Sequence, residues 1–327
     1  MDIVCRASNR MLVGLPLCRD PDWMDLNKRF TLDMVKASIV LTVIPAALRP
    51  AVAPFLRDVS KGIERGTKHI EPLIKERLEN EAQHGKDWPG RPNDIISWLF
   101  DVTRERPRST LRMVKAILMT NFAAIHTTTM TLTTLMYELT KHQEYIRPLR
   151  EEIETIIAAE GWSKSSVRKM CKLDSFIKEC LRLSDMGLLL MNRKALKDFT
   201  FRNGMTIPAG SIVSVPYLPV HTDTDNFTDP QTFDGFRFEK LRSQEGEELK
   251  HQLVTTGVDY VLFGHGRHGC PGRFFVVNEV KVLLAHVLLK YDVKMADGKD
   301  APKCWQFGTV TGPNMLAKVM FRKRQEA

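Results

Sequence analysis

A short run near the carboxyl end, from Phe263 to Phe274, constrains this chain more than any other part of it. It reads Phe-Gly-His-Gly-Arg-His-Gly-Cys-Pro-Gly-Arg-Phe and places one thiol, Cys270, among four glycines and a proline. Glycine permits positive φ angles and the close approach of a flat object, and proline is tolerated in the first turn of a helix. The apolar stretch that follows predicts a helix from Phe274 to Leu289. A cysteine just before a helix amino terminus is suited to carry a thiolate ligand for a metal.

Two other interpretations of this loop remain open from the residues alone. One is a glycine-rich turn that holds a buried structural cysteine. The other is a zinc site formed by His265, His268 and Cys270. The paired spacings that structural zinc sites usually show, Cys-x-x-Cys or His-x3-His, are absent from the run, which disfavours zinc.

Composition and charge place the chain among globular proteins. Its 327 residues suffice for one large core or two ordinary ones, and 43% hydrophobic with 27% charged content excludes a disordered chain. The net charge of +9 is spread along the chain, which argues against a nucleic-acid partner. This basic surface is either ordinary solvated surface or a docking face for an acidic electron-donor protein. Six cysteines without regular spacing favour reduced thiols in a cytosol-like compartment.

Two apolar stretches are long enough to be compared with a membrane span. Residues 38–56 are rich in Ile, Val, Leu and Ala, but three prolines interrupt them, so the stretch is too broken to span a bilayer. Residues 116–137 lack charged side chains but contain seven threonines, and therefore predict a helix buried in protein rather than in lipid. The first ten residues show no secretory signal, and no transmembrane anchor is expected there.

The periodicity of the chain predicts a mainly α protein with small β-sheets, an α+β fold in a single domain over 1–327. Helices are expected at 22–36, 59–81, 94–102, 143–159 and 175–183. A long central helix is expected at about 109–142, and Pro107 marks the boundary before it. Short strands are expected at 198–207, around a turn at Asn203-Gly204, and at 211–215, 291–295 and 315–321.

The loop at 263–272 resembles the haem-binding loop of the cytochrome P450 family, the haem-thiolate monooxygenases. That pattern is Phe, two residues, Gly, one residue, a basic residue, one residue, Cys, one residue and Gly. The positions that fit it are Phe263, Gly266, Cys270 and Gly272. His268 stands where the family usually has Arg. The resemblance implies haem b with an axial thiolate from Cys270, and cations for the haem propionates from His268 and Arg193.

Two further motifs are similar to those of the same family and occur in the family's order. Glu179-Cys180-Leu181-Arg182 carries Glu-x-x-Arg, a pair that would lock against Arg237 as a structural clamp. Residues 123–128, Ala-Ala-Ile-His-Thr-Thr, resemble the oxygen-activation motif of the long helix. Thr127 matches the family's Thr, and His126 stands in place of its acid. The resemblance implies that both take part in proton delivery.

The resemblance extends over nearly the whole chain and implies a cytochrome P450-like fold that lacks its N-terminal part. The anchor, small sheet and first helices of the family are not found ahead of Met11. Residues 38–56 then correspond to a segment that dips into the membrane surface. The family is expected at the surface of the endoplasmic reticulum membrane, and a chain without an anchor is expected in the cytosol.

The leading hypothesis is a haem-dependent monooxygenase of fungal secondary metabolism. It would insert one oxygen atom into an apolar small molecule, terpenoid- or polyketide-like, with electrons from an NADPH-dependent flavoprotein reductase. One alternative is a truncated, non-catalytic remnant of a haem protein. Another is a haem-thiolate isomerase or dehydratase, for which His126 in place of the acid is the support. Substrate-lining side chains are expected from 38–56, the long helix and 186–191.

Overall fold

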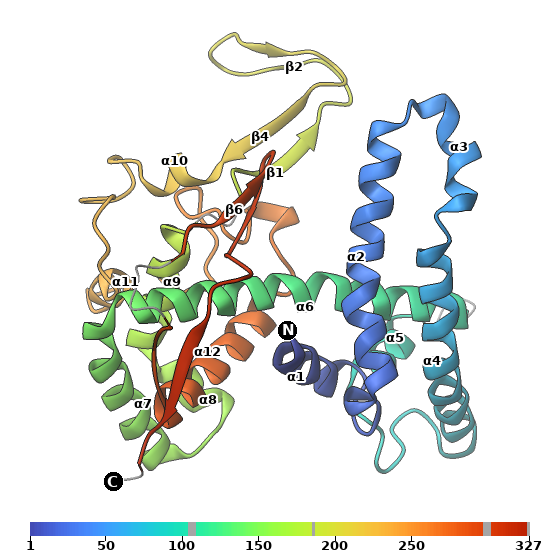
Figure 1. Cartoon of the computed structure of the whole chain (residues 1–327), viewed down its shortest axis with the longest axis horizontal. Coiled ribbons are helices and arrows are strands. Elements are labelled where there is room, and N and C mark those ends of the chain that lie inside the picture. Colours follow the sequence, from blue (N-terminus) through green and yellow to red (C-terminus); the bar gives the residue numbers. More distant parts are fainter. Residues whose placement is uncertain (104–108, 185–186, 297–301, 326–327) are drawn as a thin grey trace. The chain divides into compact units, whose positions relative to one another are not determined.

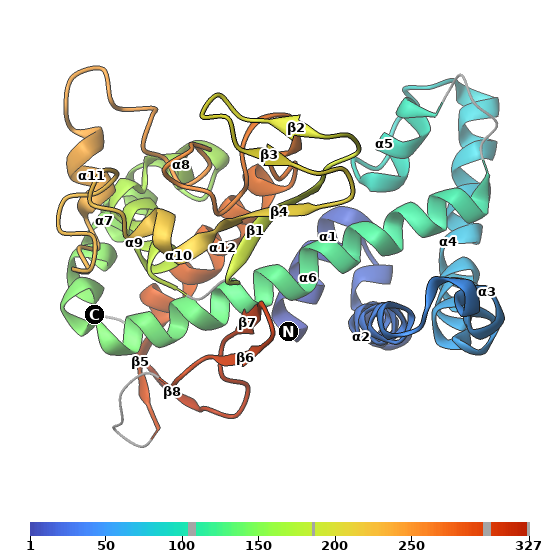
Figure 2. The same ribbon diagram turned by 90° about the horizontal axis from the view of Figure 1, so that it is seen from above.

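The structure is a computed structural model and describes residues 1–103, 109–184, 187–296 and 302–325 (Figures 1 and 2). These residues group into two compact units, Met1–Thr129 and Met130–Ala327, each with its own hydrophobic core. The long helix α6 (Thr110–Lys141) contributes residues to both units. The assignment of 1–327 to a single domain stays a prediction.

The first unit is built from helices. They are α1 (Asp2–Leu12), α2 (Pro21–Val43), α3 (Arg49–Val52), α4 (Arg57–His84), α5 (Ile95–Val102) and the first part of α6, with the short 3-10 turns η1 (Leu17–Arg19), η2 (Ala46–Leu48) and η3 (Ala53–Phe55). Helix α2 begins at Pro21 because the Asp20 side chain accepts a hydrogen bond from Trp23 N at 2.8 Å. It ends ahead of Pro45, since proline disfavours a helical conformation in the residue before it.

Helices α2 and α4 lie side by side in the first unit (Figure 1). Two glycines of α4 permit this close packing. A Cβ on Gly62 would lie 2.8 Å from the ring of Phe30, and one on Gly66 would lie 3.1 Å from Leu118. Larger side chains at these two positions would push the neighbouring helices apart, which costs packing energy in a close-packed core.

A buried ion pair joins α4 to the start of α5. Both terminal nitrogens of the Arg77 guanidinium donate to the carboxylate of Asp94, and only 7% and 4% of the two side chains are exposed. Asp94 also accepts a hydrogen bond from Ser97 N at 3.1 Å, so the same carboxylate caps α5. The pairing and the cap together let this charge remain inside the unit.

The second unit combines helices with four two-stranded antiparallel sheets in its described part. Its helices are the end of α6, α7 (Ile146–Glu160), α8 (Lys164–Lys169), α9 (Cys171–Arg182), α10 (Tyr217–His221), α11 (Arg237–Arg242) and α12 (Arg273–Lys290), with η4 (Gln143–Tyr145) and η5 (Gly266–His268). The sheets pair β1 (Leu189–Lys194) with β4 (Ile212–Pro216), β2 (Phe199–Thr200) with β3 (Thr206–Ile207), β5 (Tyr291–Met295) with β8 (Val319–Lys323), and β6 (Trp305–Phe307) with β7 (Val310–Gly312).

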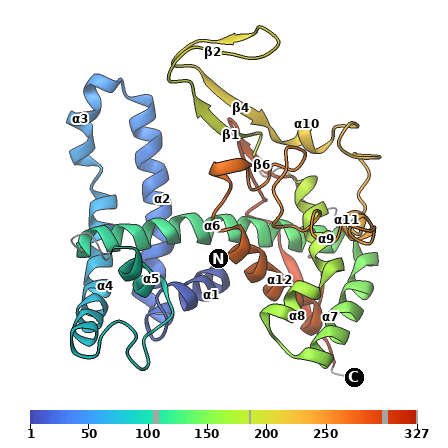
Figure 3. The same cartoon turned by 180° about the vertical axis from the view of Figure 1, so that it is seen from behind.

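The core of the second unit lies where α7, α9 and α12 meet the last turns of α6 (Figure 3). Leu149, Phe176 and Leu284, from three of these helices, have no exposed surface. Burial of such large apolar side chains is the main stabilising contribution to a core. This core fixes α9 and the amino end of α12, the two elements that flank the candidate site.

The predicted mainly α fold with small sheets is confirmed, and the long helix predicted at about 109–142 is α6. The predicted turn at Asn203-Gly204 connects β2 to β3, with Gly204 at φ 85°. Several elements were not expected, and they are α1, the short helices α3, α8, α10 and α11, strand β1 and the β6–β7 hairpin. The strand expected at 315–321 begins only at Val319. Pro107 and Met186, used above as boundaries, lie outside the described residues.

The prediction that residues 116–137 are buried is wrong for one face of α6. Ile117 and Ile125 have no exposed surface, whereas a stripe on another face of the helix is exposed. Its members are four residues apart and are Met119, Ala123 and Thr127. Some threonine hydroxyls of this stretch donate within the helix, as Thr120 does to Ala116 O at 2.9 Å, whereas the buried Oγ1 of Thr128 has no partner among the described residues. Within the described residues, none of the helices has both the length and the apolarity that crossing a bilayer requires.

Candidate functional site

The loop that carries Cys270 is held in place by its own backbone. Cys270 N donates to Phe263 O at 2.7 Å, and Gly269 N donates to Gly266 O at 3.0 Å. Phe263 packs against the hydrophobic core of the second unit and so fixes the start of the loop. The position of the thiol is therefore set by main-chain hydrogen bonds and one partly buried ring.

Glycines determine the shape of this loop. Gly264 and Gly266 have φ angles of 68° and 66°, a region that residues with a Cβ rarely adopt. A Cβ on Gly269 would lie 3.3 Å from Gly266 O, so a side chain there would crowd the turn. A Cβ on Gly272 would lie 3.9 Å from Cys270 Sγ. Glycine at this last position keeps one approach to the sulfur free of side-chain atoms.

Cys270 is a free, partly buried cysteine directly before α12. Gly272 is the N-cap of this helix. Arg273 Nη1 donates to Cys270 O at 2.8 Å, and its Nε donates to Val254 O at 3.2 Å. Both Arg273 contacts are to main-chain oxygens and hold the backbone at this helix start. The amino terminus of a helix is a favourable place for negative charge, which suits a sulfur that acts as a metal ligand. The alternative of a fully buried structural cysteine does not describe this residue.

The zinc alternative is also wrong for this loop. The residues that the structure describes contain one group of His, Cys, Asp or Glu ligand atoms close enough to share a metal, and it lies elsewhere, at Asp20, Asp22 and His69 of the first unit. There the Arg65 guanidinium and His69 lower the pKa of Asp22 through hydrogen bonds to its carboxylate. A cation already occupies that carboxylate, so we assign no metal there.

His268 and Arg193, the two expected propionate contacts, lie in the same unit as Cys270. His268 is exposed within η5, and Arg193 is exposed on β1, opposite Val213 of β4. Arg193 Nη1 donates to the adjacent Asn192 O at 2.9 Å. Within the described residues neither side chain is engaged in an ion pair, so both cations are available to an anionic ligand. Their contact with a propionate stays a prediction.

A bulge in β1 directs Met191 toward the loop. The register between β1 and β4 shifts between Leu190 and Arg193, and Met191 has a φ angle of 54°. Its Cγ lies 3.9 Å from where a Cβ on Gly264 would be. Sequence reasoning placed substrate-lining residues at 186–191 without singling out Met191. The sequence gives no indication of a bulge at Met191, because methionine rarely adopts a positive φ angle.

The Glu-x-x-Arg clamp forms as predicted. Arg182 Nε and Nη2 donate to the two carboxylate oxygens of Glu179 at 2.7 and 2.8 Å, and Arg237 Nε donates to Glu179 Oε1 at 3.1 Å. Glu179 and Arg182 have no exposed surface, and 12% of the Arg237 side chain is exposed. Asp234 N donates the fourth hydrogen bond to this carboxylate, at Oε1 and 3.0 Å. The carboxylate is thereby paired and satisfied, as a buried charge must be.

His221, which sequence reasoning missed, connects this clamp to the start of the loop. Arg182 Nη1 donates to His221 O at 2.6 Å, and His221 Nδ1 lies 3.2 Å from Arg182 O. His221 Nε2 accepts a hydrogen bond from Val261 N at 3.0 Å. These partners assign the tautomer with the proton on Nδ1. Burial lowers the pKa of His221 to about 4, so the ring is neutral at physiological pH. A single buried histidine carries no motif that would reveal such a role.

His126 and Thr127 lie on α6 in the first unit, and the loop with Cys270 lies in the second. Thr127 is exposed, and its Oγ1 donates to Ala123 O at 2.7 Å. His126 is partly buried, and its Nε2 lies 3.3 Å from Lys28 O of α2. Because a carbonyl can only accept, the proton of the neutral ring is on Nε2. Burial also lowers the pKa of His126 below its ordinary value.

Comparison with known proteins agrees with this arrangement. The sequence pattern of the family described as Cytochrome P450 matches residues 3–319. Cytochrome P450 monooxygenase 151 of Postia placenta is 41% identical over 326 residues, which cover 99% of this chain and 65% of the relative. Cytochrome P450 monooxygenase olcJ of Penicillium canescens is 35% identical, with 100% of this chain and 62% of the relative covered. For Cytochrome P450 monooxygenase janQ of Penicillium janthinellum the identity is 36%, with 99% and 64% covered.

The chain thus spans less than two thirds of the length of these fungal relatives, at 62–65% of each. The match nevertheless runs through α6, the Glu179–Arg182–Arg237 clamp and the Cys270 loop. Fold, order of motifs and relatives agree, and the chain belongs to the cytochrome P450 family.

Proposed function

We propose that this chain acts as a haem-dependent monooxygenase that oxidises an apolar small molecule in fungal secondary metabolism. The observation that carries the proposal is the Cys270 loop, whose thiol lies at the amino end of α12 and is positioned by backbone hydrogen bonds. Relatives with the word monooxygenase in their names support the same activity. Terpenoid- and polyketide-like molecules are the substrate classes that we expect.

The residues present fit haem b. A planar ligand whose metal takes one protein sulfur needs a thiol on a surface without bulky side chains. The loop offers Cys270 with glycine at positions 264, 266, 269 and 272. A Cβ on Gly272 would begin 3.9 Å from Sγ and narrow the approach to the sulfur. Cys270 would therefore hold the haem iron as its thiolate ligand. Phe263, Gly266 and Gly272 would shape the site, and His268 and Arg193 would contact the propionates.

Bound through a thiolate, haem supplies dioxygen activation, in which two electrons and two protons convert O₂ and a C–H bond into an alcohol and water. Cys270 supplies the anionic sulfur, and the helix amino terminus stabilises its charge. The electrons would come from an NADPH-dependent flavoprotein reductase, for which the basic surface of the chain, net charge +9, offers complementary charge. The substrate needs only an apolar pocket that orients it and excludes water.

Thr127 is the residue that we assign to proton delivery. Its hydroxyl is exposed on α6 and holds a proton at Oγ1 that points back to Ala123 O at 2.7 Å. Rotation about Cα–Cβ would turn the same proton outward, at the cost of one modest hydrogen bond. His126 cannot replace an acid in its neutral form, because its Nε2 proton faces Lys28 O. We therefore assign His126 a positioning role between α6 and α2.

Peripheral contact with the endoplasmic reticulum membrane is proposed for residues 38–56. The end of α2 and the turns after it expose large apolar side chains, with 80% of Val43, 56% of Leu48 and 82% of Phe55 accessible. Scattered apolar residues are ordinary on a surface, but a continuous set on one segment is typical of a partner or membrane contact. Arg49 lies among these residues and Arg57 follows them, and both would interact with anionic headgroups.

A carbon monoxide spectrum tests the assignment of Cys270. The purified chain is loaded with haem, reduced and exposed to carbon monoxide. The expected result is the red-shifted absorption band of a thiolate ligand. In Cys270→Ser this band should be lost, whereas Cys304→Ser, a change at an exposed cysteine, should retain it.

Two results would overturn the proposal. If the chain retains no haem, the non-catalytic remnant is the better description. If the thiolate band is present but no NADPH is consumed with a reductase and O₂, the isomerase or dehydratase alternative is favoured. His126, in place of the family's acid, is the observation that keeps that alternative in view.

A further inference from the structure

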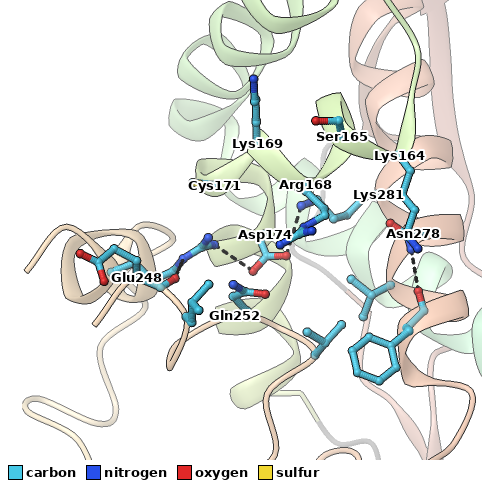
Figure 4. A pocket seen from close by; sticks show the side chains of 15 residues that line it. Lys164, Ser165, Arg168, Lys169, Cys171, Asp174, Glu248, Gln252, Asn278 and Lys281 are labelled. Carbon is cyan, nitrogen blue, oxygen red and sulfur yellow. Dashed lines mark hydrogen bonds and ion pairs between the residues drawn. The ribbon is translucent and has the colours of Figure 1, made fainter. Parts of the chain in front are cut away.

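A cavity of about 650 Å³ opens in the second unit between α8, the start of α9, residues 242–254 and α12 (Figure 4). We propose that it binds an organic anion, a phosphate monoester or carboxylate attached to an apolar body. The cavity is separate from the loop residues assigned to haem. The proposal does not depend on the haem function, and its test needs no haem.

The first observation is the charge of the cavity walls. Five cationic side chains line it, but Lys169 is ion-paired with Glu160, which lies outside the lining. The remaining cations are Lys164, Arg168, Arg242 and Lys281, against the carboxylates of Asp174 and Glu248. Figure 4 shows Arg168 and Lys281 extending toward Asp174, while Lys169 is directed away from them. The cavity therefore has an excess of positive charge over its centre.

Asp174 does not neutralise this excess. Its carboxylate accepts from Lys281 Nζ at 3.2 Å and Arg242 Nη1 at 3.4 Å, and from Leu253 N at 2.9 Å. Lys281 is only 3% exposed and Asp174 only 6%. The side chains at this end of the cavity therefore form a buried, preorganised network of hydrogen bonds. One carboxylate shared by two cations leaves net positive charge at its open side.

Two cations lie at the entrance of the cavity. Within the described residues, neither Lys164 nor Arg168 forms a hydrogen bond or an ion pair through its side chain, and both are exposed on α8. Arg168 presents a guanidinium that matches two oxygens of a phosphate or carboxylate. An anion that enters would thus meet two unpaired cations before it reaches Arg242 and Lys281.

The second observation is the apolar part of the walls. Leu249, Val254, Phe274 and Val277 line the same cavity. Leu249 is 69% exposed and Phe274 is 55% exposed, a large apolar area that the protein itself leaves uncovered. An inorganic anion would leave these side chains in water. An anion with a short alkyl or aryl body would cover them, which identifies the ligand class as amphiphilic.

Calorimetric titration of the full chain with octyl phosphate tests this site. We expect saturable one-to-one binding that weakens as salt is raised. Inorganic phosphate has no apolar body and ethyl phosphate has a very short one, and both serve as control probes. Each methylene group that is buried on binding should improve the affinity by about fourfold at most. Octanol serves as the probe without the anion. Both kinds of truncated probe should bind much more weakly than octyl phosphate.

The variants Arg168→Gln and Lys164→Gln remove the entrance cations. Each should weaken octyl phosphate binding about tenfold, the loss of one charge-assisted hydrogen bond. Arg168→Lys should recover part of the affinity, because it keeps the charge but not the fork. Lys294→Gln, an exposed lysine on β5 that does not line the cavity, is the matched control and should bind as the parent does. Circular dichroism checks that the exposed substitutions leave the fold intact.

Vesicles that contain phosphatidic acid separate the two sources of such an anion. If vesicle binding is lost in Arg168→Gln, the anion is a lipid headgroup. If octyl phosphate binds but vesicles do not, it is a soluble metabolite. No measurable binding of either probe, or binding that the two glutamine variants leave unchanged, would overturn the proposal.

Discussion

His221 and Arg182 hold each other through two hydrogen bonds that run in opposite directions. Arg182 Nη1 donates to His221 O at 2.6 Å, and His221 Nδ1, at 3.2 Å, donates to Arg182 O. The second ring nitrogen of His221 accepts from Val261 N, and Val261 O in turn accepts from Gly264 N at 2.9 Å. The buried clamp on Glu179 is thus connected to the Cys270 loop by a short chain of hydrogen bonds, all within the second unit.

This series of hydrogen bonds requires the neutral imidazole of His221, so the stability of the fold should depend on pH. His221 has no exposed surface, and burial lowers its pKa from 6.5 to about 4. A depressed histidine pKa means that the unfolded state binds the proton first. The stability that neutral His221 contributes is therefore complete above the pKa of the unfolded state. It is lost as the pH falls toward the pKa of the folded state. Between about pH 7 and about pH 5 the free energy of unfolding should fall by about 2 kcal/mol from this group alone.

Urea unfolding at several pH values checks the prediction. The amide of His221→Gln does not titrate. The variant should therefore be less stable near neutral pH, but its free energy of unfolding should decrease less on acidification. His84→Gln, a change at an exposed histidine at the end of α4, is the control and should keep the parent's pH dependence. An unchanged pH slope in His221→Gln would show that His221 does not titrate as stated.

The two arginines of the clamp should differ in importance. Arg182 is fully buried, makes two hydrogen bonds to Glu179 and donates to Pro230 O at 2.7 Å. Arg182→Lys cannot reproduce this fork and should cost about 3–5 kcal/mol of unfolding free energy. Arg237 is partly exposed, so Arg237→Lys should cost about 1–2 kcal/mol. Denaturant unfolding measures both, and equal losses would contradict the assignment of Arg182 as the central cation.

Sequence reasoning predicted the parts of the fold whose signal is local. The α6 helix, the Asn203-Gly204 turn and the helix after Cys270 depend on apolar periodicity and turn residues that can be read along the chain. Strand β1 was missed because it pairs with β4 across a bulge at Met191, and pairing partners are not visible in a single sequence. The exposed stripe through Thr127 was missed because the stretch has no charged residues. Such a sequence does not distinguish a helix that is buried on one face from a helix that is buried on all faces.

The candidate site shows the same division. The motif identified Cys270, Glu179, Arg182 and Arg237, because their spacing is fixed by the family pattern. It could not identify His221 or the cavity at Arg168 and Lys281. Those depend on segments far apart in sequence, such as 174 and 281, that meet only through tertiary packing. Buried polar contacts of this kind are where a single sequence carries least information.

For the proposed monooxygenase activity, Thr127→Ala should uncouple electron use from product formation. Removal of the hydroxyl removes the proton held at Oγ1, so more of the NADPH consumed should appear as hydrogen peroxide, by about tenfold relative to product. Thr127→Ser keeps a hydroxyl at the same position and should retain coupling. His126→Gln can still donate to Lys28 O and should also retain coupling near neutral pH. The measurement is peroxide released per NADPH oxidised with a flavoprotein reductase. Equal uncoupling in the alanine and serine variants would rule out the hydroxyl as the cause.

Gly264→Ala should impair haem retention more than it impairs folding. Gly264 has a φ angle of 68°, so alanine there costs about 1–2 kcal/mol of backbone strain. Gly90 has a φ angle of 83° and an open surrounding, so Gly90→Ala carries a similar strain far from the loop in sequence. Both variants should lose similar unfolding free energy in urea, but only Gly264→Ala should lower the haem content after gel filtration. Equal haem content in the two variants would show that the loop tolerates the change.

Apolar side chains at 43 and 55 should control membrane association. Val43 and Phe55 are 80% and 82% exposed, so their replacement by serine costs little folding energy and removes apolar area that would otherwise enter the lipid. Val43→Ser with Phe55→Ser should lower the affinity for liposomes, measured by sedimentation, by about thirtyfold or more, since each large side chain contributes about 1 kcal/mol or more on transfer. Leu196→Ser with Leu316→Ser, two similarly exposed leucines of the second unit at 90% and 88%, is the matched control and should sediment as the parent does. If the control pair reduces sedimentation as strongly, the contact is a general property of exposed apolar residues and does not belong to segment 38–56.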